Sequence, residues 1–186
     1  SSVMSERFEE MTQKADAPFI AAIAQYAGLV KSKDAFIALV LPKEGKEIEG
    51  FNSLLLELEK MKRFGFTNTE VERVKTNLLK ATEKAYNERD NRYSQKLAEE
   101  YIRHYLSDEA VPGIEAEFDL VKTLLPQISA EIVNQIVKQY ITDENIIITV
   151  NAAEKPEVKV PTKDQLLSAL ADVKNAELTA KAEEGE

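Results

Sequence analysis

Histidine chemistry has one candidate in this sequence. His104, in the stretch YIRHYLSDE, is the only histidine, and Glu100 and Asp108 lie four residues before and after it. On a helix that spacing places the three side chains on one face, where they could share a metal ion. A zinc motif of the H-x-x-E-H kind needs two imidazoles one helical turn apart, which a single histidine cannot supply. We therefore interpret His104 as a half-exposed residue on a charged helix.

Carboxylate pairs and serines are the next candidates, because acid–base and nucleophilic catalysis both use such groups. Adjacent acids on a helix point in different directions, and nothing near these pairs is apolar enough to raise the pKa of one partner. We interpret them as solvated helix faces: Glu9 with Glu10, Glu99 with Glu100, and Asp108 with Glu109. No histidine and acid stand at a spacing that suggests a triad with Ser53, Ser94 or Ser107, although triads assemble in space.

Two further groups suit binding better than catalysis. Arg89, Arg92 and Tyr93 form either a binding patch or the polar middle of a long helix, and we favour the second. The stretch PKEGKEIEG lacks the GxxxxGK[ST] order of a phosphate loop and indicates a turn. The tyrosines between residues 86 and 105 favour packing along a helix over stacking on bases. The sequence therefore predicts no catalytic, cofactor-binding or metal-binding residue in this chain.

Composition bounds the classes of partner and compartment. The 186 residues carry a formal net charge of -9, which argues against nucleic acid and anionic membrane surfaces as partners. No apolar run approaches the ~18 residues of a membrane span, and without cysteine there is no disulfide or Cys-ligated zinc. The first residues lack the layout of a signal peptide, so either the chain is not exported or its natural N-terminus is missing. Bacterial periplasm and cytoplasm both stay open as locations.

The elements that must position these residues begin with a helix and a hairpin. Apolar spacing predicts a short helix in SVMSERFEEMTQKA. A strand in PFIAAIAQYAGLV and another in DAFIALVLP follow, joined by the polar connection KSKD. The second strand holds seven apolar residues in a row, which favours burial on both faces. From Glu47 the apolar residues advance by three and four, which is typical of an amphipathic helix.

The stretch RFGFTNTEVERVK, residues 63–75, ends that helix and starts another. Gly65 suits the left-handed residue that closes a helix, where a Cβ costs energy. Thr67 with Glu70 predicts a capping box, and Phe66 with Val71 occupies the positions of a hydrophobic staple. We interpret the junction as architectural, because it sets the angle between two long helices.

The remaining elements are mainly helical. The helix after Thr67 can run to about Leu106 with a break or kink near Asn87–Asn91, and further helices are predicted over 114–125 and after Ser129. NIIITVN at 145–151 predicts a strand, and Thr162 with Gln165 predicts a capped final helix. The class is therefore α+β, with long helices packed on one face of a small, mainly antiparallel sheet. We expect a single partial domain over residues 1–175 and a polar tail over 176–186; a sheet this small exposes an edge that missing strands would complete.

The order and separation of several stretches resemble the second domain of pitrilysin–insulinase family zinc metallopeptidases, especially bacterial members. The most specific are RFGFTNTEVERVK, LLPQISAEIVNQIVKQYITDENIIITV and VPTKDQLLSAL, and the likeness runs from about Arg7 to Leu170. The resemblance implies that the H-x-x-E-H zinc motif lies in another domain of a longer parent enzyme. In that enzyme, zinc would activate a water for attack on a peptide bond. This chain holds no such motif, so we expect it to bind no cofactor and to line the substrate chamber.

The resemblance also bears on which half of the parent the chain represents. Many members carry an Arg and a Tyr seven residues apart in the half that faces the zinc site, where Thr12 and Phe19 stand here. Their absence favours the zinc-bearing half or a degenerate one. The expected partners are the parent's other domains and a peptide substrate. Two alternatives remain: a non-catalytic, substrate-binding partner subunit of the same family, and an unrelated helical interaction module that would contain no β structure.

Overall fold

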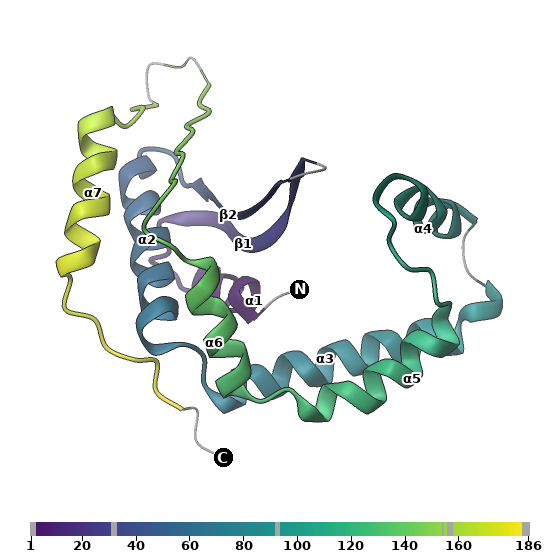
Figure 1. The fold of residues 1–186 in the computed structure, drawn as a ribbon. Coiled ribbons are helices and arrows are strands. Elements are labelled where there is room, and N and C mark those ends of the chain that lie inside the picture. Colours follow the sequence, from purple (N-terminus) through teal and green to yellow (C-terminus); the bar gives the residue numbers. More distant parts are fainter. Residues whose placement is uncertain (1–2, 31–32, 92–93, 154, 156–157, 184–186) are drawn as a thin grey trace. The chain divides into compact units, whose positions relative to one another are not determined.

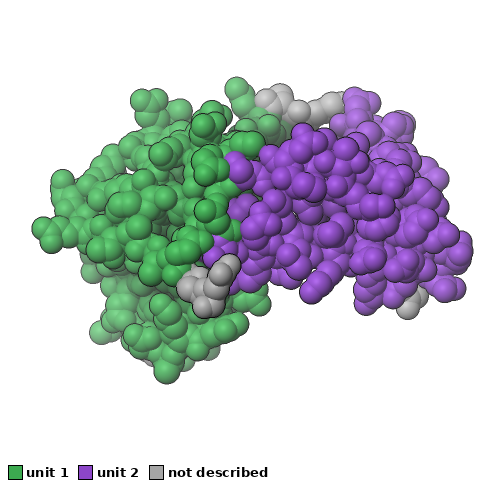
Figure 2. All heavy atoms as spheres, turned by 90° about the horizontal axis from the view of Figure 1, so that it is seen from below, with its two compact units in different colours: residues 1–68, 130–186 green, residues 69–129 purple. Residues whose placement is uncertain are grey.

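The computed structural model describes residues 3–30, 33–91, 94–153, 155 and 158–183 (Figure 1). It divides into two compact units, one formed by residues 1–68 and 130–186 and the other by residues 69–129 (Figure 2). We call them unit 1 and unit 2 and describe each by itself. Helices pack with a two-stranded antiparallel sheet, so the predicted α+β class is confirmed. The expected boundary between a domain ending at residue 175 and a tail stays a prediction.

The hairpin of unit 1 has the predicted strands, β1 (Phe19–Val30) and β2 (Lys33–Pro42). They pair antiparallel in a register that sets Ala22 opposite Val40 and Ala24 opposite Ala38. Lys31 and Ser32 of the predicted connection KSKD lie outside the described residues. A module built of helices alone would contain no such hairpin, so the helical-module alternative is wrong.

The prediction that the second strand is buried on both faces is wrong. Leu39 and Leu41 are each more than half exposed, whereas Ala22 and Ala24 of β1 are buried. Because side chains alternate across a sheet, this pattern shows that the helices cover one face. The other face lacks a covering layer among the described residues, and Ile23 is exposed there too.

The core of unit 1 forms where three elements meet. Its largest fully buried side chains are Phe8 from α1 (Val3–Thr12), Phe19 from β1, and Met61 from α2 (Glu47–Phe64). The α1 helix packs against β1, and α2 packs against β2. Two later helices, α6 (Ala130–Tyr140) and α7 (Lys163–Asn175), pack on α2. The helix α7 begins with the predicted capping box, in which Thr162 and Gln165 exchange side-chain and backbone hydrogen bonds.

The regular elements among the described residues of unit 2 are all helices or 3-10 turns. Its elements are α3 (Asn68–Asn87), the 3-10 turn η1 (Arg89–Asn91), α4 (Ser94–Ser107), α5 (Ile114–Leu124) and the 3-10 turn η2 (Leu125–Gln127). The break predicted near Asn87–Asn91 is confirmed, because α3 ends at Asn87. The helix α5 ends before Pro126, as predicted. No described helix of either unit is both long and apolar enough to span a membrane.

The prediction of a strand at 145–151 is wrong for this chain. These residues lie in an irregular connection between α6 and α7, which Figure 1 shows as a long trace, and they form no strand. Ile147 is 88% exposed. The sequence has the composition of a strand, but a strand also needs a neighbour to bond with. The sheet that the described residues form contains β1 and β2 alone.

Candidate functional site

The single histidine lies on the exposed surface of α4. Its Nδ1 atom stands 2.7 Å from the backbone oxygen of Glu109, so the Nδ1–H tautomer donates this bond. Arg103 on the same helix donates from Nε to the Glu109 carboxylate at 3.0 Å. Within the described residues, no three side chains of His, Cys, Asp or Glu gather into a set that could hold a metal. The weighed combination of His104 with Glu100 and Asp108 is therefore not brought together.

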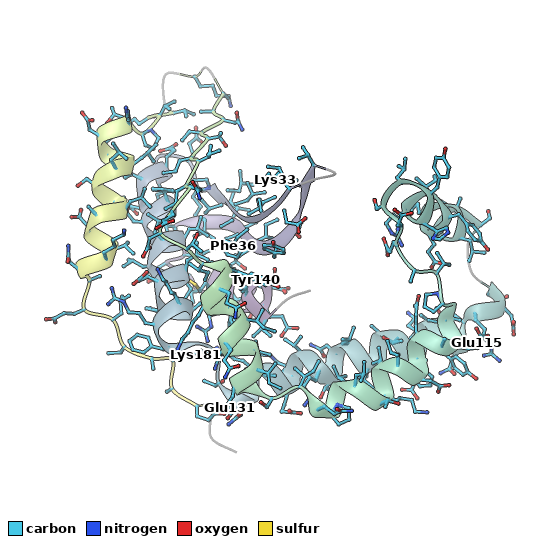
Figure 3. The ribbon with its side chains drawn as sticks, viewed as in Figure 1. Lys33, Phe36, Glu115, Glu131, Tyr140 and Lys181 are labelled. Carbon is cyan, nitrogen blue, oxygen red and sulfur yellow. The ribbon has the colours of Figure 1, made fainter. Side chains whose placement is uncertain are left out.

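The carboxylate pairs and serines are distributed over α1, α2, α4 and the residues directly after α4. Glu99 accepts from Gln95 on the exposed side of α4, and Glu10 pairs with Lys181 of the C-terminal segment, which Figure 3 labels. Ser53 lies on α2, whereas Ser94 and Ser107 are the two end residues of α4. No hydrogen bond joins a serine to His104 in the part of the chain that the structure describes. None of these groups has the geometry of a nucleophile with its base.

Arg89 is bound within unit 2. Its guanidinium lies 4.4 Å from the ring centroid of Tyr86, and its Nε atom is 3.4 Å from Glu115, which Figure 3 labels. The Tyr86 ring stacks on the Phe118 ring of α5 with centroids 4.9 Å apart. The Nζ atom of Lys122 lies 4.9 Å from the centroid of the Phe118 ring. This series of cation and ring contacts joins α3 to α5. Arg92 and Tyr93, the other two residues of that candidate patch, lie outside the described residues.

The most elaborate polar arrangement surrounds the end of α2. Arg7 of α1 is 3% exposed, donates from Nη2 to the Gly65 carbonyl at 3.0 Å, and lies 3.5 Å from the Glu57 carboxylate. Its guanidinium also lies 4.5 Å from the centroid of the Phe66 ring. A buried charge needs a partner of opposite sign and hydrogen bonds, and Arg7 has both.

Asn134 of α6 completes this arrangement. Its Oδ1 accepts from the Phe66 N–H at 2.7 Å and its Nδ2 donates to the Phe66 carbonyl at 3.1 Å. One amide therefore satisfies both backbone groups of a buried residue, which a neighbouring strand would do in a sheet. We call Arg7, Glu57, Gly65, Phe66 and Asn134 the junction cluster.

The backbone angles and the surroundings of residue 65 explain why it is a glycine. Its φ of 73° is positive, as predicted, but its ψ of -151° lies in a region that essentially glycine alone adopts, and not in the left-handed helical region. A Cβ on this residue would collide with the side-chain amide of Asn134. Sequence reasoning found the glycine through its place after a helical pattern. It missed Arg7 and Asn134, because nothing in their local sequence marks them as buried.

A second cluster joins α2 to α7. Arg63 donates to three carbonyls at the C-terminal end of α7, those of Val173, Lys174 and Ala176, and to Glu59 on its own helix. A guanidinium satisfies carbonyls there that have no partner within the helix. Asp143 pairs with Lys62 at 2.8 Å. The hydrogen bond from Lys62, with smaller help from Lys174, lowers the pKa of Asp143 although its partial burial acts in the opposite direction.

Thr12 and Phe19, which the resemblance aligns with an Arg and a Tyr of other members, have structural roles here. Thr12 donates from its hydroxyl to the Glu9 carbonyl at 2.6 Å. Phe19 is 1% exposed in the core. Tyr26 of β1 stacks on Tyr140 of α6, which is labelled in Figure 3, with ring centroids 4.3 Å apart. Partial burial, then the charge of Asp34, raises the pKa of the Tyr26 phenol.

Part of the chain is similar in sequence to a known protein. The chain is 48% identical over 71 residues to a protein of Arabidopsis thaliana named zinc protease PQQL-like. The matched region covers 38% of this chain and 7% of the relative. No model of a known protein family matches the chain.

Comparison of folds covers nearly the whole chain. The first half of the periplasmic protease PqqL of Escherichia coli matches 97% of it with a TM-score of 0.75 at 18% identity. An insulinase family protease of Yersinia pestis, described as predicted, matches 92% with a TM-score of 0.73 at 14% identity. The chain spans 39% and 36% of these two structures. The resemblance to a segment of pitrilysin–insulinase family proteases is therefore confirmed, and the fold is theirs.

Proposed function

We propose that this chain is a non-catalytic domain segment of a larger zinc-dependent metallopeptidase that hydrolyses peptides. One observation carries the proposal: the chain has the fold of part of PqqL over 97% of its length and shares 48% identity over 71 residues with a protein named as a zinc protease. The chain spans a small part of these relatives. The peptide substrate and the activity therefore belong to the whole protein that we propose.

The residues present do not fit a zinc ion. The sequence contains one histidine and no H-x-x-E-H motif, and the described residues hold no cluster that could bind a metal. The zinc of the parent enzyme, and the attack on the peptide bond that it supports, are therefore assigned to another domain. We derive no catalytic step for this chain.

In that enzyme the chain forms part of the wall of the substrate chamber and part of the scaffold between domains. The junction cluster fixes α1, α2 and α6 against one another, and Arg63 fixes α7 on α2. The net charge of -9 gives the segment an acidic potential that favours basic peptides near it. These properties suit a rigid part of a substrate chamber that also contacts neighbouring domains.

We assign the segment to the half of the parent that carries the zinc motif or to a degenerate half. Thr12 and Phe19 replace the Arg and Tyr that contact substrate in the other half, and neither side chain presents such a group.

The test compares this chain with the longer polypeptide that its gene encodes. Purified alone, the chain should bind no stoichiometric zinc in calorimetric titration and should cleave no peptide. The longer protein should contain an upstream H-x-x-E-H motif and should lose its peptidase activity with a chelator. One tight zinc site in this chain alone would contradict the proposal. A longer protein without the motif, which binds peptides but does not cleave them, would indicate the partner-subunit alternative.

A further inference from the structure

An aromatic pair lies near the end of the hairpin where β1 connects to β2. Tyr26 of β1 stacks on Tyr140, the last residue of α6, with the ring planes only 11° apart. Phe36 of β2 stands opposite Tyr26 in the register, and Figure 3 labels both Phe36 and Tyr140. Although one face of its ring is covered in this way, Tyr26 is 48% exposed. The exposed surface of the ring therefore lies on its other face and its edges.

The carboxylate of Asp34 lies beside this exposed ring. The Tyr26 hydroxyl donates to Oδ2 of Asp34 at 3.5 Å. The other oxygen, Oδ1, lies over Gly28, which stands opposite Asp34 in the register, and a Cβ on Gly28 would be 3.7 Å from it. The two contacts fix where each oxygen of the carboxylate lies. Because Gly28 has no side chain, the space next to Oδ1 stays open.

Asp34 has no cationic partner among the residues that the structure describes. The contact that the structure gives its carboxylate is the hydrogen bond from Tyr26. Lys33, labelled in Figure 3, precedes Asp34 in β2, and successive side chains of a strand point to opposite faces. A single surface carboxylate is common. A carboxylate held beside an exposed aromatic face, however, combines the two kinds of group that bind an organic cation.

We propose that Tyr26 and Asp34 bind the side chain of an arginine in the peptide that the parent enzyme cleaves. A guanidinium is flat, stacks on aromatic rings and donates several hydrogen bonds from one plane. It can therefore lie against the Tyr26 ring and donate to Asp34 at the same time, which the compact ammonium of a lysine does less well. The net charge of -9 favours the approach of a basic peptide. The inference rests on the proposed function and adds a class of substrate residue to it.

A titration followed by nuclear magnetic resonance tests the site without depending on activity. The probe is the pentapeptide Ala-Ala-Arg-Ala-Ala, acetylated and amidated so that its ends carry no charge. It should bind this chain with a dissociation constant on the order of 1 mM and should shift the signals of Tyr26 and Gly28. The same peptide with citrulline, which keeps the shape of arginine without its charge, should bind at least ~5-fold more weakly.

Variants of this chain locate the binding. Asp34→Asn and Tyr26→Leu should each weaken binding of the arginine peptide by at least ~5-fold, whereas Tyr26→Phe, which keeps the ring, should change it by less than ~2-fold. Tyr105→Leu is the matched control for the ring, since Tyr105 is 86% exposed on α4. Asp164→Asn on α7 is the control for charge, because it changes the net charge by the same amount. Neither control should change the binding.

The longer protein tests whether the site selects substrate. Peptides with one arginine should be cleaved with a kcat/KM at least ~5-fold above that of their citrulline counterparts. Asp34→Asn should bring this ratio close to 1, and Asp164→Asn should leave the ratio unchanged.

The outcomes separate this inference from the proposed function. Binding that depends on Tyr26 and Asp34, with a longer protein that cleaves no peptide, supports the site and contradicts the function. An active longer protein that shows no preference for arginine contradicts the site as a substrate site. Binding that Tyr26→Leu and Asp34→Asn leave unchanged would assign the attraction to net charge and overturn the inference. If this chain binds the peptide but the longer protein does not, another domain covers the site, and the inference is overturned too.

Discussion

The junction cluster and the segment 146–150 differ in whether their groups find partners among the described residues of unit 1. At the junction, each of the groups we name has a partner within unit 1: Arg7 binds Glu57 and Gly65, and Asn134 binds both backbone groups of Phe66. In the segment, β-branched residues have no strand to pair with among the described residues, and Ile147 is almost wholly exposed.

The difference teaches which parts of the fold this chain can stabilise by itself. Burying polar groups is favourable only when their bonds are satisfied, and the junction satisfies them from three elements of the same unit. Among the described residues, the segment and the open face of the hairpin lack such neighbours. This contrast is what we expect of the proposed domain segment of a larger enzyme, whereas the junction satisfies its own polar groups.

The largest effect is expected for Gly65→Ala. The variant places a Cβ at positive φ and displaces the Asn134 amide, so the free energy of unfolding should fall by about 3–5 kcal/mol. Urea unfolding followed by circular dichroism measures it. Gly45→Ala is the matched control, since its φ is 75° and no atom lies within 4 Å of the new Cβ; it should cost about 1–2 kcal/mol. Equal losses would show that the backbone conformation alone matters at the junction.

Arg7→Met should have the next largest effect. It leaves the Glu57 carboxylate buried with Lys60 at 3.5 Å and removes the donor to Gly65, so unfolding should become easier by about 2–4 kcal/mol. Lys46→Met breaks an exposed pair with Glu49 and should change stability by less than about 0.5 kcal/mol. If the two variants lose the same amount, the buried ion pair does not hold the junction together.

Asp143→Asn should have a small effect that depends on pH. Because the pKa of Asp143 is lowered in the folded chain, its carboxylate stabilises the fold above the unfolded value of about 3.9. This contribution is lost as the pH falls through the lower folded value. Urea unfolding between pH 3 and 6 should show wild type and variant converging at the acid end. A Lys62→Met background should remove most of the difference; a difference that persists there would contradict the assigned cause.

Ile147→Ser should have the smallest effect on this chain. The side chain is already exposed, so the free energy of unfolding should change by less than about 0.5 kcal/mol. Ile141→Ser, six residues earlier and buried, should cost about 2–4 kcal/mol. A large loss for Ile147→Ser in the isolated chain would mean that the segment already has a partner there, which would remove the contrast with the junction.

Local patterns in the sequence determined most elements of this fold. The hairpin, the helix that ends at Gly65, the break after Asn87 and the capping box at Thr162 depend on residues near one another in the chain. Helix periodicity, turn residues and caps are local signals, so one sequence suffices to read them.

Tertiary structure decided what those local signals could not. Arg7 is 58 positions from Gly65 and Asn134 is 68 positions from Phe66, yet each forms a hydrogen bond with that residue. No local rule predicts such contacts. The strand at 145–151 failed for the complementary reason: strand propensity is local, but a strand exists only where another chain segment bonds to it. Which buried charges are paired, and which strands find a neighbour, depends on the packing of distant segments.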